Sequence, residues 1–478
     1  MSISSALNNA MSGLTANARM TEVTSNNLSN VLTDGYAQRS VDLSPALLGG
    51  VNIDGINRFV DAGLLADRRL SDAALQGQDR STSMLIRLEQ SLGDAEDLAS
   101  IGSRLAAFEN ALISASSDPA SETRLNAVVS RLGDLTTTLQ ANTRTVQELR
   151  QEADAAIARD IEVLNTSLQQ VEDMNADILR LKSTGNDPSS LIDARQQVVD
   201  QIAGIVPIRE LPRDNGTIAL MTTTGTTLVD GRRVEFEFTR TPTITADMTL
   251  ASGALGAIMV DGEALDLATG IGRLDGGSLG AAFALRDGTL VDVQAGLDEI
   301  AVDLVARFED PANDPTLTAG DLGLLTDEGG TLDLADTVGL AGRIGINAAV
   351  DPDVGGDVTL LRDGLNAVAA GPVGDSTQLN RWIEALDVSR NDLPGSALQS
   401  AAGRTASFTS QLGATRLAAE EQLSFTSARW DTLREAELAN GVDTDLELQM
   451  LLRVEQAYAA NARVIQTVDS MMQRLMEI

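Results

Sequence analysis

The most regular pattern of apolar and polar positions lies near the C-terminal end of the chain. Apolar side chains recur there at alternating spacings of three and four residues, the heptad pattern of a helix that packs along another helix. One position in the series, Asn461, is polar and would fix the register of that packing. Thr444-Asp-Leu-Glu447 has the form of a capping box, so we expect the helix to begin there. The series comprises Leu451, Val454, Tyr458, Asn461, Ile465, Val468, Met472 and Leu475.

A weaker seam with the same spacing opens the chain. Its apolar positions are Ile3, Leu7, Ala10 and Leu14, and the phase continues through Asn17, Thr21 and Thr24 to Leu28 and Val31. Neither terminal helix can bury its stripe alone, so the pattern predicts that the two pair with each other or with neighbouring subunits. On periodicity alone, two ordinary helices docked on one globular core remain the alternative.

A third seam lies in the first half of the chain. Eleven apolar positions from Val146 to Leu181 have a mean spacing of 3.5 residues, which predicts a rod-like helix about 50 Å long. Helical patterns also cover residues 58–95, 100–116, 120–145, 189–204 and 398–439, and the last is expected to pack antiparallel on the rod. Residues 288–308 are helical in pattern too.

The composition changes between these helical patterns. Thr and Gly are dense from 206 to 285, and Val234, Phe236 and Phe238 alternate with acidic residues after Asp230-Gly231, which is a hairpin signature. Residues 309–365 are rich in Gly, Asp and Pro and predict loops with short strands. The expected fold class is therefore mainly α with a β-rich insertion. Its parts are a terminal coiled-coil assembly domain (1–38 and 442–478), a helical rod domain (39–205 and 366–441) and a β-rich outer domain (206–365).

The strongly acidic net charge of the chain makes some classes of binding partner unfavourable. The formal net charge is −34 and the pI is about 4.2, so nucleic acid and anionic membranes are poor partners. Residues 1–57 account for only −2 of this charge and residues 442–478 for −3. Near-neutral ends on an acidic body favour ends that pack together while the body stays solvated.

The residue inventory excludes much of enzyme chemistry. The chain has no His and no Cys, which removes imidazole bases, thiol nucleophiles and the usual zinc ligands. Its single Lys, Lys182, lies at a predicted helix end and in no phosphate-binding loop. We therefore expect no catalytic residues, no metal and no cofactor, although 69 acidic residues leave a carboxylate pair open.

Targeting signals are equally sparse. No apolar run approaches the roughly 18 residues that a membrane span needs, so no membrane insertion is expected. The N-terminal stretch lacks the basic and apolar regions of a cleaved signal peptide. A cytosolic protein, or one exported by a route that reads no such signal, fits these features.

Short sequence motifs at the two chain ends are more specific to one protein family than the heptad patterns are. Met11-Ser-Gly-Leu14, Ser25-Asn-Asn-Leu-Ser-Asn30 and Thr33-Asp-Gly-Tyr36 resemble the N-terminal signature of the flagellar rod, hook and hook-associated axial proteins. Gly441-Val-Asp443, Glu455-Gln-Ala-Tyr-Ala-Ala-Asn-Ala462 and Val464-Ile465 resemble the C-terminal signature of the same family. The chain departs from the family pattern in two places: Gln38 and Arg39 are transposed, and Glu455 stands where Gln is typical.

The resemblance implies a structural subunit of the bacterial flagellum that joins hook to filament by helical self-assembly around the export channel. Its implied partners are further copies of itself, hook protein, hook-associated protein 3 and a flagellar export chaperone, and its implied location is extracellular. The chaperone would cover Leu451, Val454, Tyr458, Ile465 and Val468 before export. The implied assembly interface comprises the C-terminal series above together with Ile3, Leu7, Ala10, Leu14, Asn26, Asn27, Asn30, Gly35, Tyr36 and Arg39.

Each of the motif residues also has a plain local explanation. Asn26, Asn27 and Asn30 can cap a helix end and bridge to backbone groups, and Gly35 permits a positive φ in the turn that leaves the helix. Two other functions stay open at this point. One is a different axial subunit, either hook protein or hook-associated protein 3. The other is a glycan-acting enzyme on an axial scaffold, which would need an Asp/Glu pair facing a cleft.

Overall fold

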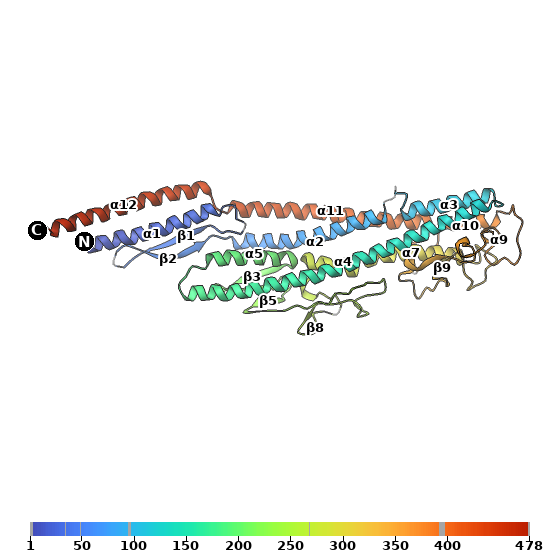
Figure 1. Ribbon diagram of the computed structural model, residues 1–478, viewed down its shortest axis with the longest axis horizontal. Helices are drawn as coiled ribbons and strands as arrows, with labels where there is room; N and C mark the ends of the chain where they lie inside the picture. The colour runs from blue at the N-terminus through green and yellow to red at the C-terminus, as the bar shows by residue number, and fades with distance from the viewer. Residues whose placement is uncertain are drawn as a thin grey trace.

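The computed structural model describes residues 3–33, 35–47, 49–93, 97–266, 268–391 and 397–476. They form an elongated molecule in which long helices run side by side, with both chain termini at one end (Figure 1). The α-helices are α1 (Ile3–Ser29), α2 (Ala62–Leu92), α3 (Ile101–Ser117), α4 (Glu122–Ser183), α5 (Ser189–Ile205), α6 (Gly277–Ala284), α7 (Leu290–Glu309), α8 (Leu340–Arg343), α9 (Leu360–Asp363), α10 (Thr377–Asp387), α11 (Ala401–Ala439) and α12 (Thr444–Met476).

The strands are short and form small antiparallel sheets. One hairpin lies beside α1, and a four-stranded sheet of order β3-β4-β5-β6 lies beside α4 and α5. Gly231 turns the chain between β5 and β6, as the Asp230-Gly231 signature predicted, but β6 ends at Arg233, and the alternating residues Val234, Phe236 and Phe238 lie outside the strands. The strands are β1 (Arg39–Pro45), β2 (Val51–Arg58), β3 (Ile208–Pro212), β4 (Ile218–Thr222), β5 (Thr227–Asp230), β6 (Arg232–Arg233), β7 (Met259–Val260), β8 (Glu263–Ala264), β9 (Leu325–Asp327) and β10 (Ile344–Ile346).

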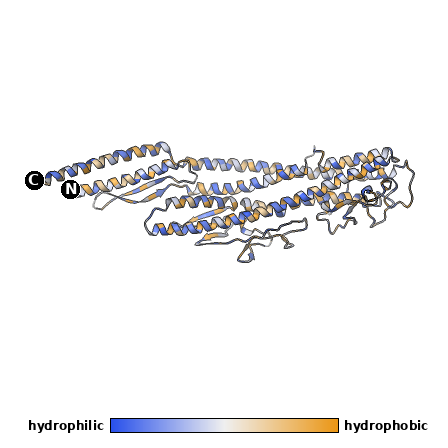
Figure 2. Cartoon of the chain, viewed as in Figure 1, coloured by the Kyte–Doolittle hydropathy of each residue, from blue (hydrophilic) through white to orange (hydrophobic). Residues whose placement is uncertain are grey.

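Helix α4 forms the spine of the molecule. Its 62 residues span about 93 Å, longer than expected, because the helical patterns before and after position 146 join without a break. Nine of the eleven positions in the predicted seam are buried, and Met174 and Leu181 are half-buried. Figure 2 shows hydrophobic and hydrophilic residues interspersed along each long helix, as expected of helices that are covered on one side only.

Helix α11 packs antiparallel on α2, as Figure 1 shows. Arg68 of α2 lies 2.9 Å from the Glu437 carboxylate, and Glu89 lies 2.5 Å from Arg416 at the other end of the contact. The helix expected over 398–439 is therefore present, but the expectation that it packs on the rod of residues 146–181 is wrong, because its packing partner is α2.

Two hydrophobic cores lie along this body. The first joins α3, α7, α10 and parts of α2, α4 and α11, and contains the edge-to-face aromatic contacts Phe108–Phe308 and Phe308–Trp382. The second joins the C-terminal half of α4 with α5, α6 and strands β3, β4 and β5. Neither core contains a residue of α1 or α12. The terminal helices therefore depend on each other and on the β1–β2 hairpin for what burial they have.

Candidate functional site

The terminal helices α1 and α12 lie along each other and run in opposite directions (Figure 1). We call them the terminal pair. Two contacts set their register: Asn27 binds Glu447, and the α-carbon of Gly13 lies against the Asn461 side chain. Fourteen residues separate the two contacts on each helix, so the helices keep one register over about 21 Å.

The register contact at Gly13 depends on its missing side chain. A Cβ at this position would lie 2.7 Å from Asn461 Nδ2, closer than real Cβ contacts. The polar position in the predicted seam thus packs against the glycine of the N-terminal motif. Gly13 is quoted in that motif, but nothing in a heptad pattern marks it as a contact.

The predicted seam on α12 faces α1 in part. Val454 and Val468 are buried, and Leu451, Asn461 and Ile465 are half-buried. Tyr458 and Met472 are 49% and 46% exposed, and the Leu475 side chain lies outside the described residues. On α1, Ala10 is buried, whereas Ile3, Leu7 and Leu14 are half-buried.

The capping box predicted at Thr444 is wrong in its details. Asp443 caps α12, because its Oδ1 accepts the backbone N–H groups of Asp445 at 2.9 Å and Leu446 at 3.1 Å. Glu447 is therefore free to leave its own helix end. Its Oε1 accepts from Asn27 Nδ2 at 2.7 Å and from Gln38 Nε2 at 2.8 Å.

Asn27 is the centre of this arrangement, and its side chain uses both ends of its amide. Nδ2 also donates to the Arg39 carbonyl at 2.8 Å, while Oδ1 accepts from the Arg39 N–H at 3.1 Å and from the Tyr36 hydroxyl at 2.9 Å. With 1% exposure, Asn27 would be costly to bury without these partners. It ties α1, β1 and α12 together.

Asn26 and Asn30 play smaller parts. The Asn26 side chain is exposed, and its carbonyl accepts from the backbone N–H of Asn30 at 3.1 Å and from Asn30 Nδ2 at 2.9 Å. Gly35 has φ +77, the left-handed conformation that the sequence predicted. The turn it permits brings Tyr36 back over the end of α1.

The same segment connects the terminal pair to the body. The guanidinium groups of Arg39 and Arg58 both bind the Asp193 carboxylate of α5, and Arg39 also lies 4.9 Å from the centroid of the Tyr36 ring. All three charged side chains are largely buried. We call Asn27, Tyr36, Gln38, Arg39, Arg58, Asp193 and Glu447 the joint. Gln38 and Arg39, the two transposed residues, thus bind different helices: Gln38 donates to Glu447 of α12, and Arg39 binds Asp193 of α5.

Electrostatics favour one protonation state at Tyr36. Burial raises the pKa of its phenol above the ordinary value, against the opposing effect of the Arg39 charge. Tyr36 therefore remains a hydrogen-bond donor to Asn27 across the physiological pH range.

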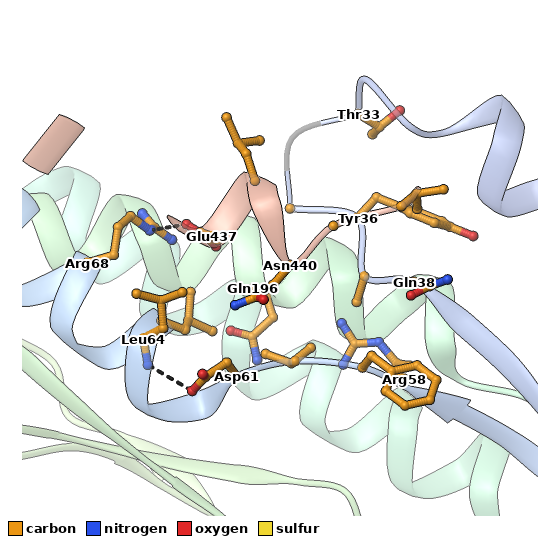
Figure 3. A pocket seen from close by; sticks show the side chains of 18 of the residues that line it. Thr33, Tyr36, Gln38, Arg58, Asp61, Leu64, Arg68, Gln196, Glu437 and Asn440 are labelled. Atoms are coloured by element: carbon orange, nitrogen blue, oxygen red, sulfur yellow. Dashed lines mark hydrogen bonds and ion pairs between the residues drawn. The ribbon is translucent and has the colours of Figure 1, made fainter. Parts of the chain in front are cut away.

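A cavity of about 360 Å³ lies beside the joint (Figure 3). Its lining residues come from the segment after α1, the start of α2, α5 and the last turn of α11. Its three carboxylates already have partners: Asp61 caps α2, Asp200 accepts from Arg68 and Arg69, and Glu437 pairs with Arg68. Although burial lowers the pKa of Arg68, the Asp200 and Glu437 charges raise it overall, which keeps Arg68 cationic.

Among the described residues there is no cluster of three or more acidic side chains placed to hold a metal ion. None of the helices in that part of the chain is long and apolar enough to cross a membrane. The distinctive feature of the site is therefore a joint between chain ends and body, built from N-terminal motif residues, Glu447 of α12 and two residues of the body.

Comparison with known families identifies this arrangement. A family model for the helical domain of the flagellar hook-associated protein FlgK matches residues 85–323, half of the chain. The chain belongs to the FlgK family. Models for the flagellar basal body rod protein and for the C-terminal region of the basal body rod proteins FlgEFG match residues 7–36 and 439–478. These two segments are the terminal pair with most of the turn that follows α1.

Relatives of the FlgK family extend over different shares of the chain. Flagellar hook-associated protein 1 of Escherichia coli (strain K12) is 25% identical over 320 residues, which cover 64% of this chain and 56% of that protein. The chain thus spans about half the length of this relative. Flagellar hook-associated protein 1 of Bacillus subtilis (strain 168) is 22% identical over 507 residues, covering 98% and 97%.

Among solved structures, the flagellar hook junction protein FlgK from Burkholderia pseudomallei resembles the chain with a TM-score of 0.45 and 17% identity. The likeness covers 56% of this chain and 46% of that one. The family resemblance inferred from the terminal motifs is confirmed by the family models.

Proposed function

We propose that this chain is a structural subunit that joins the flagellar hook to the filament by helical self-assembly through its terminal pair. The observation that carries the proposal is the joint, in which residues of the two chain ends, more than 400 positions apart, meet in one hydrogen-bonded cluster. Both ends of the chain form this pair, and neither hydrophobic core includes a residue of it. The pair is therefore placed to contact neighbouring subunits.

The finer parts of the proposal concern how the pair works. The helices of the terminal pair act as a coiled coil (1–38 and 442–478). The helical rod (39–205 and 366–441) lies between this pair and the outer surface of the assembly, where residues 206–365 form a β-rich unit. The proposed partners are further copies of the chain, hook protein and hook-associated protein 3. A flagellar export chaperone covers the C-terminal seam before the chain leaves the cell and becomes extracellular.

We propose no catalysis. The carboxylates lining the joint cavity are each held by an arginine or by a helix N-terminus, so none is placed as a free acid or base. This pairing favours a structural role over the glycan-acting enzyme that composition left open.

Electron microscopy of flagella from a strain lacking this chain tests the proposal. We expect hooks without filaments, and restoration of filaments when the chain is supplied again. Loss of the hook itself would instead indicate a hook subunit. Normal filaments on normal hooks in the deletion strain would show that the chain has no junction role.

A further inference from the structure

The tip of the β1–β2 hairpin is an uncharged, exposed surface. Residues 43–53 contain no charged side chain, in a chain where 22% of residues are charged. Leu47 is fully exposed, and the cross-strand partners Leu43 and Ile53 are 41% and 39% exposed. Apolar side chains that gather on a protruding tip mark a contact with another molecule.

The cavity beside the joint offers a second apolar surface, at a different position along the long axis of the same molecule. Phe59, Val60 and Leu438 line it and are 56%, 47% and 63% exposed. The three carboxylates of the cavity already have partners, so these apolar side chains are the exposed part of its lining that a second molecule can cover. A volume of about 360 Å³ is ample for a leucine side chain with its neighbouring backbone.

The hairpin tip cannot reach the cavity of its own chain. The Val51 N–H binds Ser12 Oγ at 3.1 Å, which fixes the tip beside the first half of α1. The cavity lies beside Asn30 and Val31, where α1 has ended. Ser12 and Ser29, the last residue of α1, are 17 positions apart, so about 26 Å of helix separates the hairpin tip from the cavity.

We propose that the Leu47 tip of one copy docks into the joint cavity of a second copy. This inference rests on the proposed self-assembly, and it assigns that assembly a contact outside the terminal pair. Two different surfaces that complement each other on identical chains make a head-to-tail contact, which generates rings or helical arrays. Neighbouring copies would then be displaced by about 30 Å along the long axis.

Single cysteines test this contact, because the chain has no Cys of its own. L47C and L438C chains, carrying tags of different size, are expressed together in the deletion strain, and isolated flagella are then oxidised. We expect a disulfide-linked dimer that contains both tags. V368C is the matched control, since Val368 is as exposed as Leu47 but lies between α9 and α10, the helices at the end of the molecule opposite the chain termini in Figure 1, and it should not link to L47C.

The outcomes separate this contact from the proposed function. Junctions that carry filaments but give no L47C–L438C dimer overturn the docking and leave the junction role standing. An L47C dimer with itself, or with another axial protein, also overturns it. Absence of the chain from flagella counts against the proposed function instead.

A second variant gives an independent readout. L47D places a charge on a fully exposed side chain, so thermal unfolding of the subunit should not change. We expect at least tenfold fewer filaments per cell, whereas V368D should behave as the unaltered chain does. Filament numbers that L47D leaves unchanged would overturn the docking.

Discussion

At the scale of single residues, both ends of the chain converge on the side chain of Asn27. It donates to Glu447 and to the Arg39 carbonyl, and it accepts from Tyr36 and the Arg39 N–H. Each of these bonds has a fixed direction, so an isosteric acid in place of the amide would lose both donors. The joint is therefore sensitive to a change of one atom.

N27D tests this dependence. The variant loses two buried donors and places a second carboxylate beside Glu447, a loss of about 1–3 kcal/mol. We expect incorporation into flagella to fall about tenfold, which corresponds to about 1.4 kcal/mol.

A compensating change makes the test specific. E447Q supplies an amide that can donate to the new carboxylate, so N27D/E447Q should recover much of the incorporation. The single variant E447Q, which keeps an acceptor oxygen, serves as the control and should be nearly neutral. Equal incorporation of N27D and the unaltered chain would show that the joint does not hold the pair.

The sequence predicted only part of this joint. Asn27, Tyr36 and Arg39 were identified through the motif, and the positive φ of Gly35 followed from turn chemistry. Glu447 was assigned to a local capping box, because the choice between Thr444 and Asp443 as cap is decided by tertiary contacts. Asp193 and Arg58 were not singled out, since no periodicity links them to either terminus.

At the scale of elements, α1 makes contacts on two sides. Gly13 meets Asn461 of α12, while the Ser12 hydroxyl accepts from the Val51 N–H of the β1–β2 hairpin. The heptad pattern marks neither position, because glycine and serine make no hydrophobic period. Ala16 is likewise outside the predicted series, although it is 2% exposed.

Close approach between elements also occurs in the body, at Gly77 of α2. A Cβ there would lie 2.7 Å from the Gly277 carbonyl, which is backbone and cannot turn away. G77A should therefore lower the free energy of unfolding by about 1–3 kcal/mol despite the better helix propensity of alanine. G133A is the matched control in α4, because its Cβ meets only Ile346 at 3.5 Å, and it should be neutral or stabilising by up to about 1 kcal/mol. Urea unfolding measures both, and equal effects would contradict this account.

The seam of α12 should separate folding from assembly. Val468 is 6% exposed against α1, and V468D puts an unpaired charge there at about 3 kcal/mol or more. Because neither core includes this residue, the melting temperature of the body should barely change while incorporation into flagella is lost. Q466D, on the exposed side of the same helix, should leave both unchanged. A fall of many degrees with V468D would place the seam in the folding core.

At the scale of the whole molecule, the chain divides between two cores and a pair of ends. Fully buried side chains such as Phe108, Phe308 and Trp382 stabilise the body, whereas few side chains of the pair are buried. The seam of α4 was predictable, because a long periodic apolar pattern is the strongest sequence signal for a helix. How residues 206–365 divide between the two cores was not predictable. That division depends on tertiary packing, and segments rich in Gly and Asp carry no apolar period that would reveal it.

This division predicts the behaviour of the free subunit. Helices of about 30 residues without a core are marginal in water, so we expect the terminal pair to be largely unfolded before assembly. Hydrogen exchange should show little protection of residues 3–29 and 444–476 in the isolated chain. Residues 125–178 should be strongly protected, and the ends should gain protection in flagella. Protection of the ends equal to that of α4 in the monomer would refute the expectation.

The antiparallel course of α1 and α12 has a mechanical consequence. Tension applied at the two termini would peel the helices apart one turn after another, so each contact breaks alone and the force stays low. A load along the long axis of the molecule, passed from a neighbour into the body, instead shears the whole length of the pair and strains the Asp193 arginine pairs together. The same contacts are thus weak against peeling and strong against shear. In the proposed junction role, a pair of this design opens readily under tension at the termini and resists loads that reach it through the body.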